Sequence, residues 1–253
     1  MEEPVRHWYP TRFFTQDDAG INFALILLNS RPALDSIDAR YITKLWPMAK
    51  IRACADGGAN RLATLNAEQG TAFYPEFICG DMDSAQKETI EMFSQKGSTI
   101  CRDFSVNATD YTKTARVLAK SAMDGSKPEI DSIVTLGVLQ GRLDHVMGCV
   151  QTLYLLEKEY PKLTFYCLLH RSMFMLLPPG RHTIHVDENV STGVCGLVPV
   201  GAPAERVTTS GLEWNLNNQT LAFGNLVSTS NNVKATEVQV TTDAPLLWIL
   251  NMK

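Results

Sequence analysis

The chain has 253 residues, of which 45% are hydrophobic and 20% are charged, and its net charge is −4. This composition is typical of a globular protein that buries a sizeable core, with room for one large domain or two smaller ones. The absence of a Lys/Arg cluster argues against a nucleic-acid surface, and the absence of a long apolar run argues against a membrane span.

Six cysteines are spread along the chain, and none of them forms a Cys-x-x-C pair. Most lie within apolar runs, which indicates small buried hydrophobic residues in a reducing compartment rather than a disulfide framework or a zinc site. The first four residues, MEEP, lack the apolar stretch of a signal peptide. These features predict a cytoplasmic protein.

The first 20 residues show no clear period and suggest a poorly ordered arm. From residue 21 to 170, short apolar runs alternate with longer amphipathic ones, which predicts βαβ units and a largely parallel sheet covered on both faces. The expected strands are 23–28, 51–55, 77–79, 99–101, 133–136 and 163–169, and the expected helices are 36–48, 59–65, 85–96, 110–122 and 142–159.

The pattern changes from residue 171 to the end of the chain at residue 253. Gly and Pro punctuate short runs rich in Val, Thr and Leu, for example at 182–186, 196–200 and 237–241, and no stretch has a convincing helical period. We therefore expect an α/β fold with two domains, an N-terminal parallel-sheet catalytic domain at 21–170 and a C-terminal antiparallel β-sandwich at 171–253.

The most informative motif is GDMDS at 80–84, which directly follows an apolar run. Residues i and i+2 of an extended backbone project the same way, so Asp81 and Asp83 are expected to face one point. Two carboxylates held that close repel each other unless a cation lies between them, and that cation is usually a divalent metal ion. Gly80 permits a tight turn, and Ser84 suits the N-cap of the next helix. The alternative is a surface turn that caps a helix.

Three further predicted strands also end in glycines and acids. Ligands of open parallel sheets bind beyond the carboxyl ends of the strands, so these segments are expected to meet at one edge. Each alone has a simpler explanation, such as a strand-to-helix turn at Asp56 or ordinary helix N-terminal chemistry at Asp110. Together they indicate a metal–nucleotide site. The segments are DGGANR at 56–61, TD at 109–110 and GVLQGRLDH at 137–145.

These motifs, in this order, resemble those of the thiamine pyrophosphokinase family. The resemblance extends to WNL at 214–216 and LVSTSN at 226–231, and it covers roughly residues 22 to 250. It implies an α/β catalytic domain followed by a β-sandwich, a homodimer that binds thiamine between its subunits, and transfer of the pyrophosphoryl group of ATP to the thiamine hydroxyl with release of AMP.

The resemblance and the residue chemistry together give a set of candidate site residues. Asp56, Asp81, Asp83, Asp110 and Asp144 form the expected catalytic acids, and Asp81, Asp83 and Asp110 are the expected Mg²⁺ ligands. One of Asp56, Asp110 and Asp144 is expected to accept the hydroxyl proton, and the sequence does not say which. The candidates for ATP are Gly57, Gly58, Asn60, Arg61, Thr109, Gly137, Gln140, Gly141 and Arg142, and those for thiamine are Asn107, Trp214, Ser228 and Thr229.

One segment departs from the family pattern. Members of the family often have Asp-x-Asp-x-Thr-Asp before this helix, whereas this chain has Ser105 and Asn107 at the positions of the first two acids. Ser and Asn can hydrogen bond but bring no charge to a cation. Asp110 is therefore expected to be the indispensable acid of this segment.

Two other functions fit parts of the pattern. Phosphatases of the haloacid dehalogenase type also place Asp-x-Asp after a strand, normally the first strand of the domain, whereas here it follows the third. That scheme also gives no role to the glycines at 57–58 or 137. A non-enzymatic protein that binds a nucleotide or another ligand is the second alternative.

Overall fold

The computed structural model describes residues 4–15, 20–29, 37–137 and 142–253. The chain divides into two compact units, residues 22–170 and residues 1–21 with 171–253. Each unit is described by itself below. Among the described residues, no helix is long and apolar enough to cross a membrane.

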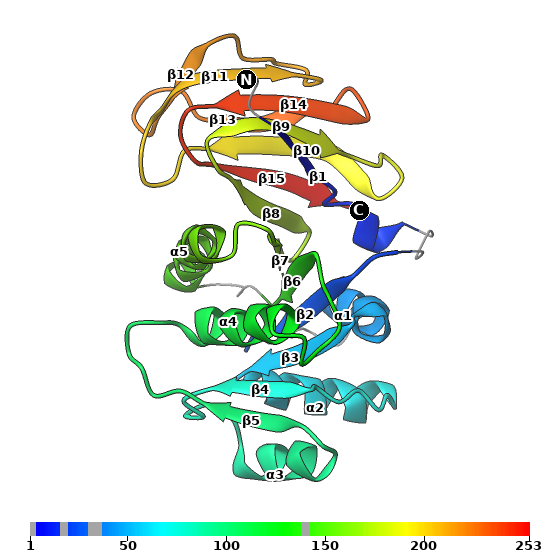
Figure 1. Cartoon of the computed structure of the whole chain (residues 1–253). Helices are drawn as coiled ribbons and strands as arrows, with labels where there is room; N and C mark the ends of the chain where they lie inside the picture. The colour runs from blue at the N-terminus through cyan, green and yellow to red at the C-terminus, as the bar shows by residue number, and fades with distance from the viewer. Residues whose placement is uncertain (1–3, 16–19, 30–36, 138–141) are drawn as a thin grey trace. The chain divides into compact units, whose positions relative to one another are not determined.

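The unit of residues 22–170 contains a parallel sheet with the strand order β7-β6-β2-β3-β4-β5 (Figure 1). Its middle strands are buried on both faces, which explains why they read as continuous apolar runs rather than as alternating ones. The strands are β2 (Phe23–Leu27), β3 (Ile51–Ala55), β4 (Phe77–Gly80), β5 (Thr99–Arg102), β6 (Ser132–Leu136) and β7 (Thr164–Leu169).

In the described part of this unit, five helices lie between these strands in the chain, and each packs against the sheet. They are α1 (Ile37–Met48), α2 (Gly58–Gln69), α3 (Lys87–Gln95), α4 (Asp110–Met123) and α5 (Leu143–Glu159). Helix α2 runs further than the expected 59–65 and ends where Gly70 takes a left-handed conformation with φ 65°. The last turn of α2 is polar, so the apolar periodicity that predicts the helix stops before the helix ends.

The strand order reverses between β2 and β6, which are neighbours in the sheet although three strands separate them in the chain. The connection from β5 to β6 runs through α4, which packs on β4, β3 and β2. In open α/β sheets, ligands bind at the carboxyl ends of the strands next to such a reversal. The loops after β2, β3 and β6 and the start of α4 therefore mark the candidate site.

The second unit consists of strands in two sheets. In one sheet the order is β1-β9-β14-β11-β12, and in the other β8, β15, β10 and β13 pair antiparallel in that order. The strands are β1 (Val5–Trp8), β8 (Ser172–Leu177), β9 (Gly180–His185), β10 (Ser191–Val198), β11 (Ala204–Ser210), β12 (Gln219–Leu221), β13 (Ser228–Asn232), β14 (Glu237–Thr242) and β15 (Leu246–Met252).

Alternation along these strands separates a buried face from an exposed one. On β14 the side chains of Val238, Val240 and Thr242 are buried, whereas those between them are exposed. This period of two is what antiparallel strands with one solvated face produce. The predicted α/β fold, with a parallel-sheet domain followed by an antiparallel-strand domain, is confirmed.

The N-terminal segment differs from the expected poorly ordered arm. Within its described residues, β1 pairs parallel with β9, and a short 3₁₀ helix, η1 (Arg12–Phe14), follows. Trp8 is 1% exposed, and its indole N–H donates to Nδ1 of His182 at 3.1 Å. One buried Trp and one edge pairing hold the strand, and neither produces a recognisable period in so short a segment.

Candidate active site

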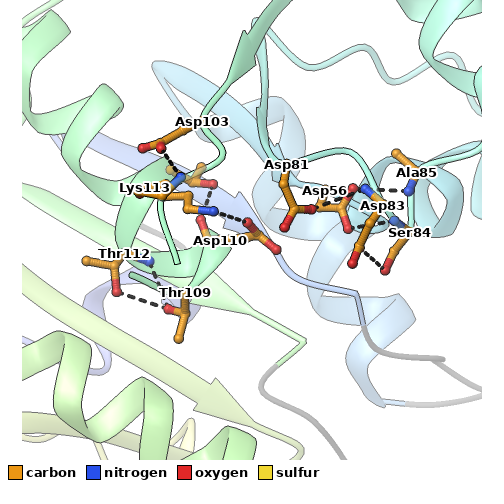
Figure 2. Close-up of polar contacts among 12 residues, drawn as sticks. Asp56, Asp81, Asp83, Ser84, Ala85, Asp103, Thr109, Asp110, Thr112 and Lys113 are labelled. Carbon is orange, nitrogen blue, oxygen red and sulfur yellow. Dashed lines mark hydrogen bonds and ion pairs between the residues drawn. The ribbon is translucent and has the colours of Figure 1, made fainter. Parts of the chain in front are cut away.

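Three carboxylates from different parts of the chain meet at the carboxyl edge of the parallel sheet. Asp56 follows β3, Asp81 follows β4, and Asp110 opens α4. One oxygen of each lies within 4.8 Å of the others (Figure 2). Among the described residues this is the one group of three or more His, Cys, Asp or Glu side chains arranged closely enough to hold a metal ion.

Asp56 ties the loop after β4 to the end of β3. It is 3% exposed, and its two carboxylate oxygens accept the backbone N–H groups of Ser84 at 3.1 Å and Ala85 at 3.0 Å. Burial raises the pKa of Asp56, and these hydrogen bonds partly offset the rise. Asp56 also has a φ of 45°, an uncommon conformation for a residue with a side chain. Such strain is typical of functional sites.

Two glycines allow the strand ends to come this close. A Cβ on Gly58 would lie 2.2 Å from the carbonyl oxygen of Leu27, which is backbone and cannot move aside. A Cβ on Gly80, whose φ is 148°, would lie 2.9 Å from Cβ of Asp56 and 3.0 Å from Oδ1 of Asp110. Gly58 and Gly80 therefore serve close packing. Gly57, a predicted ATP ligand, is the N-cap of α2.

The backbone between Asp81 and Asp83 is not the extended one that the spacing argument assumes. Met82 has a φ of 67°, so the chain turns between the two acids instead of continuing as an extended strand. Asp81 accepts the backbone N–H of Asp83 at 3.1 Å, and Asp83 accepts the hydroxyl of Ser84 at 2.8 Å (Figure 2). Asp81 belongs to the three-carboxylate group and Asp83 does not.

Ser84 is also not the N-cap of the following helix. Helix α3 begins at Lys87, and its N-cap position is occupied by Gln86 without a side-chain hydrogen bond. Asn60 holds this loop from α2, because its side chain donates to the carbonyl of Ser84 at 2.8 Å and accepts the N–H of Gln86 at 2.9 Å. Asn60 was predicted to bind ATP, but these contacts give it a role in shaping the loop.

A buried lysine stands beside the acid group. Lys113 lies one turn after Asp110 on α4, its side chain is 4% exposed, and Nζ is 3.2 Å from Oδ1 of Asp110 (Figure 2). Burial raises the pKa of Asp110, and Lys113 opposes that rise. Lys113 is not among the site residues predicted from the sequence. The sequence feature that could have identified Lys113 is its position three residues after Asp110 on a predicted helix, where the two side chains can pair.

Asn29 is a second residue that the sequence reasoning missed. It follows β2, and its Oδ1 accepts Nε–H of Arg61 at 3.0 Å. Arg61 is one of the predicted ATP ligands, and this contact turns it toward the loop after β2. Asn29 also packs against Gly57, where a Cβ would lie 2.4 Å from its Nδ2. Nothing in the local sequence marks an isolated Asn as part of a site.

A cavity of about 620 Å³ opens next to the acids. Asp56, Thr109 and Asp110 line it, together with residues at the start of α5, namely Arg142, Asp144, His145 and Gly148. The Arg142 guanidinium donates to Asp144 at 2.6 Å, and both side chains are more than 60% exposed. The Arg142 hydrogen bonds hold the pKa of Asp144 below its usual range. Asp144 lies in the cavity but outside the three-carboxylate group.

The remaining predicted residues fall in different places. Thr109 is the N-cap of α4 and accepts the N–H of Thr112, and Asn107 is exposed in the loop before it. Gly137 follows β6 with a φ of 79°. Gln140 and Gly141 lie outside the described residues.

The predicted thiamine residues Trp214, Ser228 and Thr229 belong to the other unit. Trp214 is 59% exposed and so is not a core residue, although a Trp in a β-sandwich usually is. The backbone around Trp214 is held by Asn231, whose side chain accepts the N–H of Trp214 at 3.2 Å and donates to its carbonyl at 2.8 Å. Ser228 and Thr229 open the strand that carries Asn231.

Fold and site together define a class: an α/β protein with a carboxylate-rich ligand site at the reversal point of a parallel sheet. Comparison with family models is more specific. Residues 42–165 match the thiamin pyrophosphokinase catalytic domain, and residues 181–247 match the thiamin pyrophosphokinase vitamin B1 binding domain. The chain belongs to the thiamine pyrophosphokinase family.

Individual relatives indicate the same family. Thiamine pyrophosphokinase 1 of Oryza sativa subsp. japonica is 34% identical over 248 residues, covering 94% of this chain and 90% of the relative. Thiamine pyrophosphokinase 1 of Arabidopsis thaliana is 34% identical over 250 residues, covering 94% and 89%. The chain is thus an enzyme of the kinase type, and neither a dehalogenase-type phosphatase nor a non-enzymatic binding protein is favoured.

Solved structures share the fold. The thiamin pyrophosphokinase from Candida albicans superposes with a TM-score of 0.81 at 22% identity, covering 100% of this chain and 95% of that chain. The yeast thiamin pyrophosphokinase gives a TM-score of 0.82 at 18% identity, covering 100% and 93%.

Proposed function

We propose that this enzyme transfers the intact pyrophosphoryl group of ATP to the hydroxyl of thiamine, forming thiamine diphosphate and AMP. The observation that carries the proposal is the group of Asp56, Asp81 and Asp110 at the sheet reversal, of which Asp56 and Asp110 line the adjoining cavity. The relatives named above are thiamine pyrophosphokinases, and the second half of the chain matches their vitamin B1 binding domain.

The acid group fits Mg²⁺. Carboxylate oxygens are the ligands that this ion prefers, and the one cation paired with the group, Lys113, contacts Asp110 alone among the three acids in the described structure. Asp81 and Asp110 are the side chains best placed to hold the ion, with Asp56 behind them. Bound Mg²⁺ would draw charge from the phosphates and favour in-line attack.

The chain's own residues would orient the two substrates. Arg142 and the N-terminus of α5 face the cavity and suit phosphate oxygens, because guanidinium and free backbone N–H groups both bind anions. Asp144 is the acid least suited to accept the hydroxyl proton, since Arg142 keeps its pKa low. Asp56 is occupied by two backbone N–H groups, which favours a role in shaping the loop.

The assembly and location follow from the family resemblance and from the composition. We propose a homodimer with thiamine between the subunits, where Trp214 would offer an exposed aromatic face. Activity per chain should then fall on dilution below the dimer dissociation constant, and thiamine should oppose dissociation. We also propose a cytoplasmic location, consistent with six free cysteines. Localisation of a fluorescent fusion would test it.

The reaction itself is tested by product analysis. Purified protein is incubated with ATP, Mg²⁺ and thiamine, and the nucleotides and thiamine esters are separated. Pyrophosphoryl transfer yields AMP and thiamine diphosphate in equal amounts. ADP as the main product, together with thiamine monophosphate, would contradict the proposal even if thiamine were consumed.

A further inference from the structure

Three neighbouring strands of the second unit present polar and aromatic side chains on one outward face. In the order β1-β9-β14, His7 and Tyr9 flank buried Trp8, His185 follows buried Ile184, and Glu237 pairs with His185. Because side chains alternate along a strand, His7, Tyr9, His185 and Glu237 all project away from the core. This histidine row plays no part in the acid site.

The two imidazoles of the row are directed at each other. His7 Nδ1 lies 3.0 Å from His185 Nε2, with the ring planes 21° apart. Tyr9 stacks on His185 with ring centroids 4.4 Å apart and planes 5° apart, which restrains the rotation of that ring. One proton shared between the two nitrogens accounts for this contact.

A carboxylate lies beside the other ring nitrogen of His185. Glu237 Oε1 lies 3.4 Å from His185 Nδ1, the nitrogen that faces away from His7. A proton on Nδ1 directed at this carboxylate leaves the lone pair of Nε2 pointing at His7. A histidine that binds a metal commonly donates its other N–H to a carboxylate in this way.

We propose that His7 and His185 bind a single borderline transition-metal ion, Zn²⁺, Ni²⁺ or Cu²⁺, which links the N-terminal strand β1 to β9. Imidazole suits these ions, and water would complete the coordination from the adjoining 300 Å³ cavity lined by Tyr9, His185 and Glu237. Imidazole nitrogens bind Zn²⁺ at about 2.0–2.1 Å, so two on one tetrahedral ion lie roughly 3.3 Å apart. A ring movement of a few tenths of an ångström is enough.

Metal binding requires only that one proton moves from one nitrogen of His7 to the other, so both imidazoles remain available as ligands. The proton that His7 Nδ1 shares with His185 moves to His7 Nε2, and both facing nitrogens then offer lone pairs to the ion. His7 is exposed and His185 is partly exposed, so an ion can enter from solvent. Acidification protonates the imidazoles and should release the ion.

Calorimetric titration of the untagged, full-length protein with Ni²⁺ and with Zn²⁺ tests the site. Excess Mg²⁺ is present to occupy the acid group, and the pH is 7.5. We expect one ion per chain, with affinity reduced at least ~10-fold in His7→Gln and in His185→Gln, and by ~10-fold in Glu237→Gln. His170→Gln, which removes an exposed histidine outside both sites, should bind as the unmodified protein does.

Electron paramagnetic resonance with Cu²⁺ gives an independent readout, because nitrogen coupling from two imidazoles should appear and should be lost in His7→Gln. Circular dichroism checks that the variants fold. If His185→Gln unfolds, His7→Gln decides the question, since its side chain is exposed. No binding to the unmodified protein, or equal affinity in His7→Gln, would overturn the proposal and leave the pair as a hydrogen bond only.

Discussion

The candidate site has two groups of charged side chains that are held differently. In the first group, here called the fixed wall, Asp81 lies beside Asp56, which is buried and bonded to two backbone N–H groups, and Asp110, which is paired with buried Lys113. In the second group, the exposed wall at the start of α5, the side chains of Arg142, Asp144 and His145 are 62%, 64% and 42% exposed. Fixed carboxylates suit an ion of defined geometry, whereas exposed side chains can adjust to a larger substrate.

The largest effect is expected at the fixed wall. Asp81→Asn keeps the size of the side chain and removes the charge, so turnover should fall by at least ~10²-fold, as when an electrostatic stabiliser of a transition state is lost. Stability should not fall, because the change relieves repulsion among three acids. Asp103→Asn, in an exposed acid outside the group, is the control. Steady-state kinetics and urea unfolding measure both, and near-normal turnover in Asp81→Asn would mean that this acid only shapes a turn.

Asp110→Asn should lose as much activity as Asp81→Asn and also lose stability. It leaves the ammonium group of Lys113 buried without a carboxylate, at a cost of about 1–3 kcal/mol. The double variant with Lys113→Met should recover the free energy of unfolding but not turnover. Stability unchanged in Asp110→Asn would show that Lys113 reaches water.

The close approach of the strand ends can be tested with a pair of glycines. Gly58→Ala places a methyl group against the carbonyl of Leu27 and should destabilise the protein by about 1–3 kcal/mol. Gly148→Ala lies within α5, where the new Cβ would be 3.7 Å from Cγ2 of Thr109, and should be neutral or stabilising. Thermal unfolding compares the two. Equal midpoints would contradict the steric argument.

The smallest effect is expected at the exposed wall. Arg142→Gln removes a charge from the cavity but breaks only an exposed ion pair, so the KM for ATP should rise by roughly tenfold with little change in stability. Lys87→Gln, in an exposed ion pair on α3, is the matched control. A fall in kcat with unchanged KM would place Arg142 on the reacting phosphates instead.

The sequence predicts the strand ends well and the loop geometry poorly. Apolar runs locate β2 to β7 within about two residues at each end, because buried parallel strands need continuous apolar side chains. The i, i+2 argument for Asp81 and Asp83 fails because it assumes an extended backbone. Met82 takes a left-handed backbone conformation, which the conformational preferences of Met do not predict.

Long-range partners are the other part that sequence could not provide. Asp56 is joined to Ser84 and Ala85 across 28 and 29 residues, and Asn60 to Gln86 across 26. Such contacts exist only after the strands have aligned, so the sequence alone does not show that Asn60 holds the loop after β4 or that Lys113 is buried beside Asp110. The acids could be found because several strands carry them to the same edge.

The central claim is that Asp81 and Asp110, with Asp56 behind them, hold the metal of the reaction. Crystals grown with Mn²⁺ in place of Mg²⁺ and a non-hydrolysable ATP analogue would locate the ion by anomalous diffraction. The account predicts a peak within bonding distance of Asp81 and Asp110, with the phosphates between it and Arg142. A peak elsewhere, or an acid group without an ion beside bound nucleotide, would contradict it.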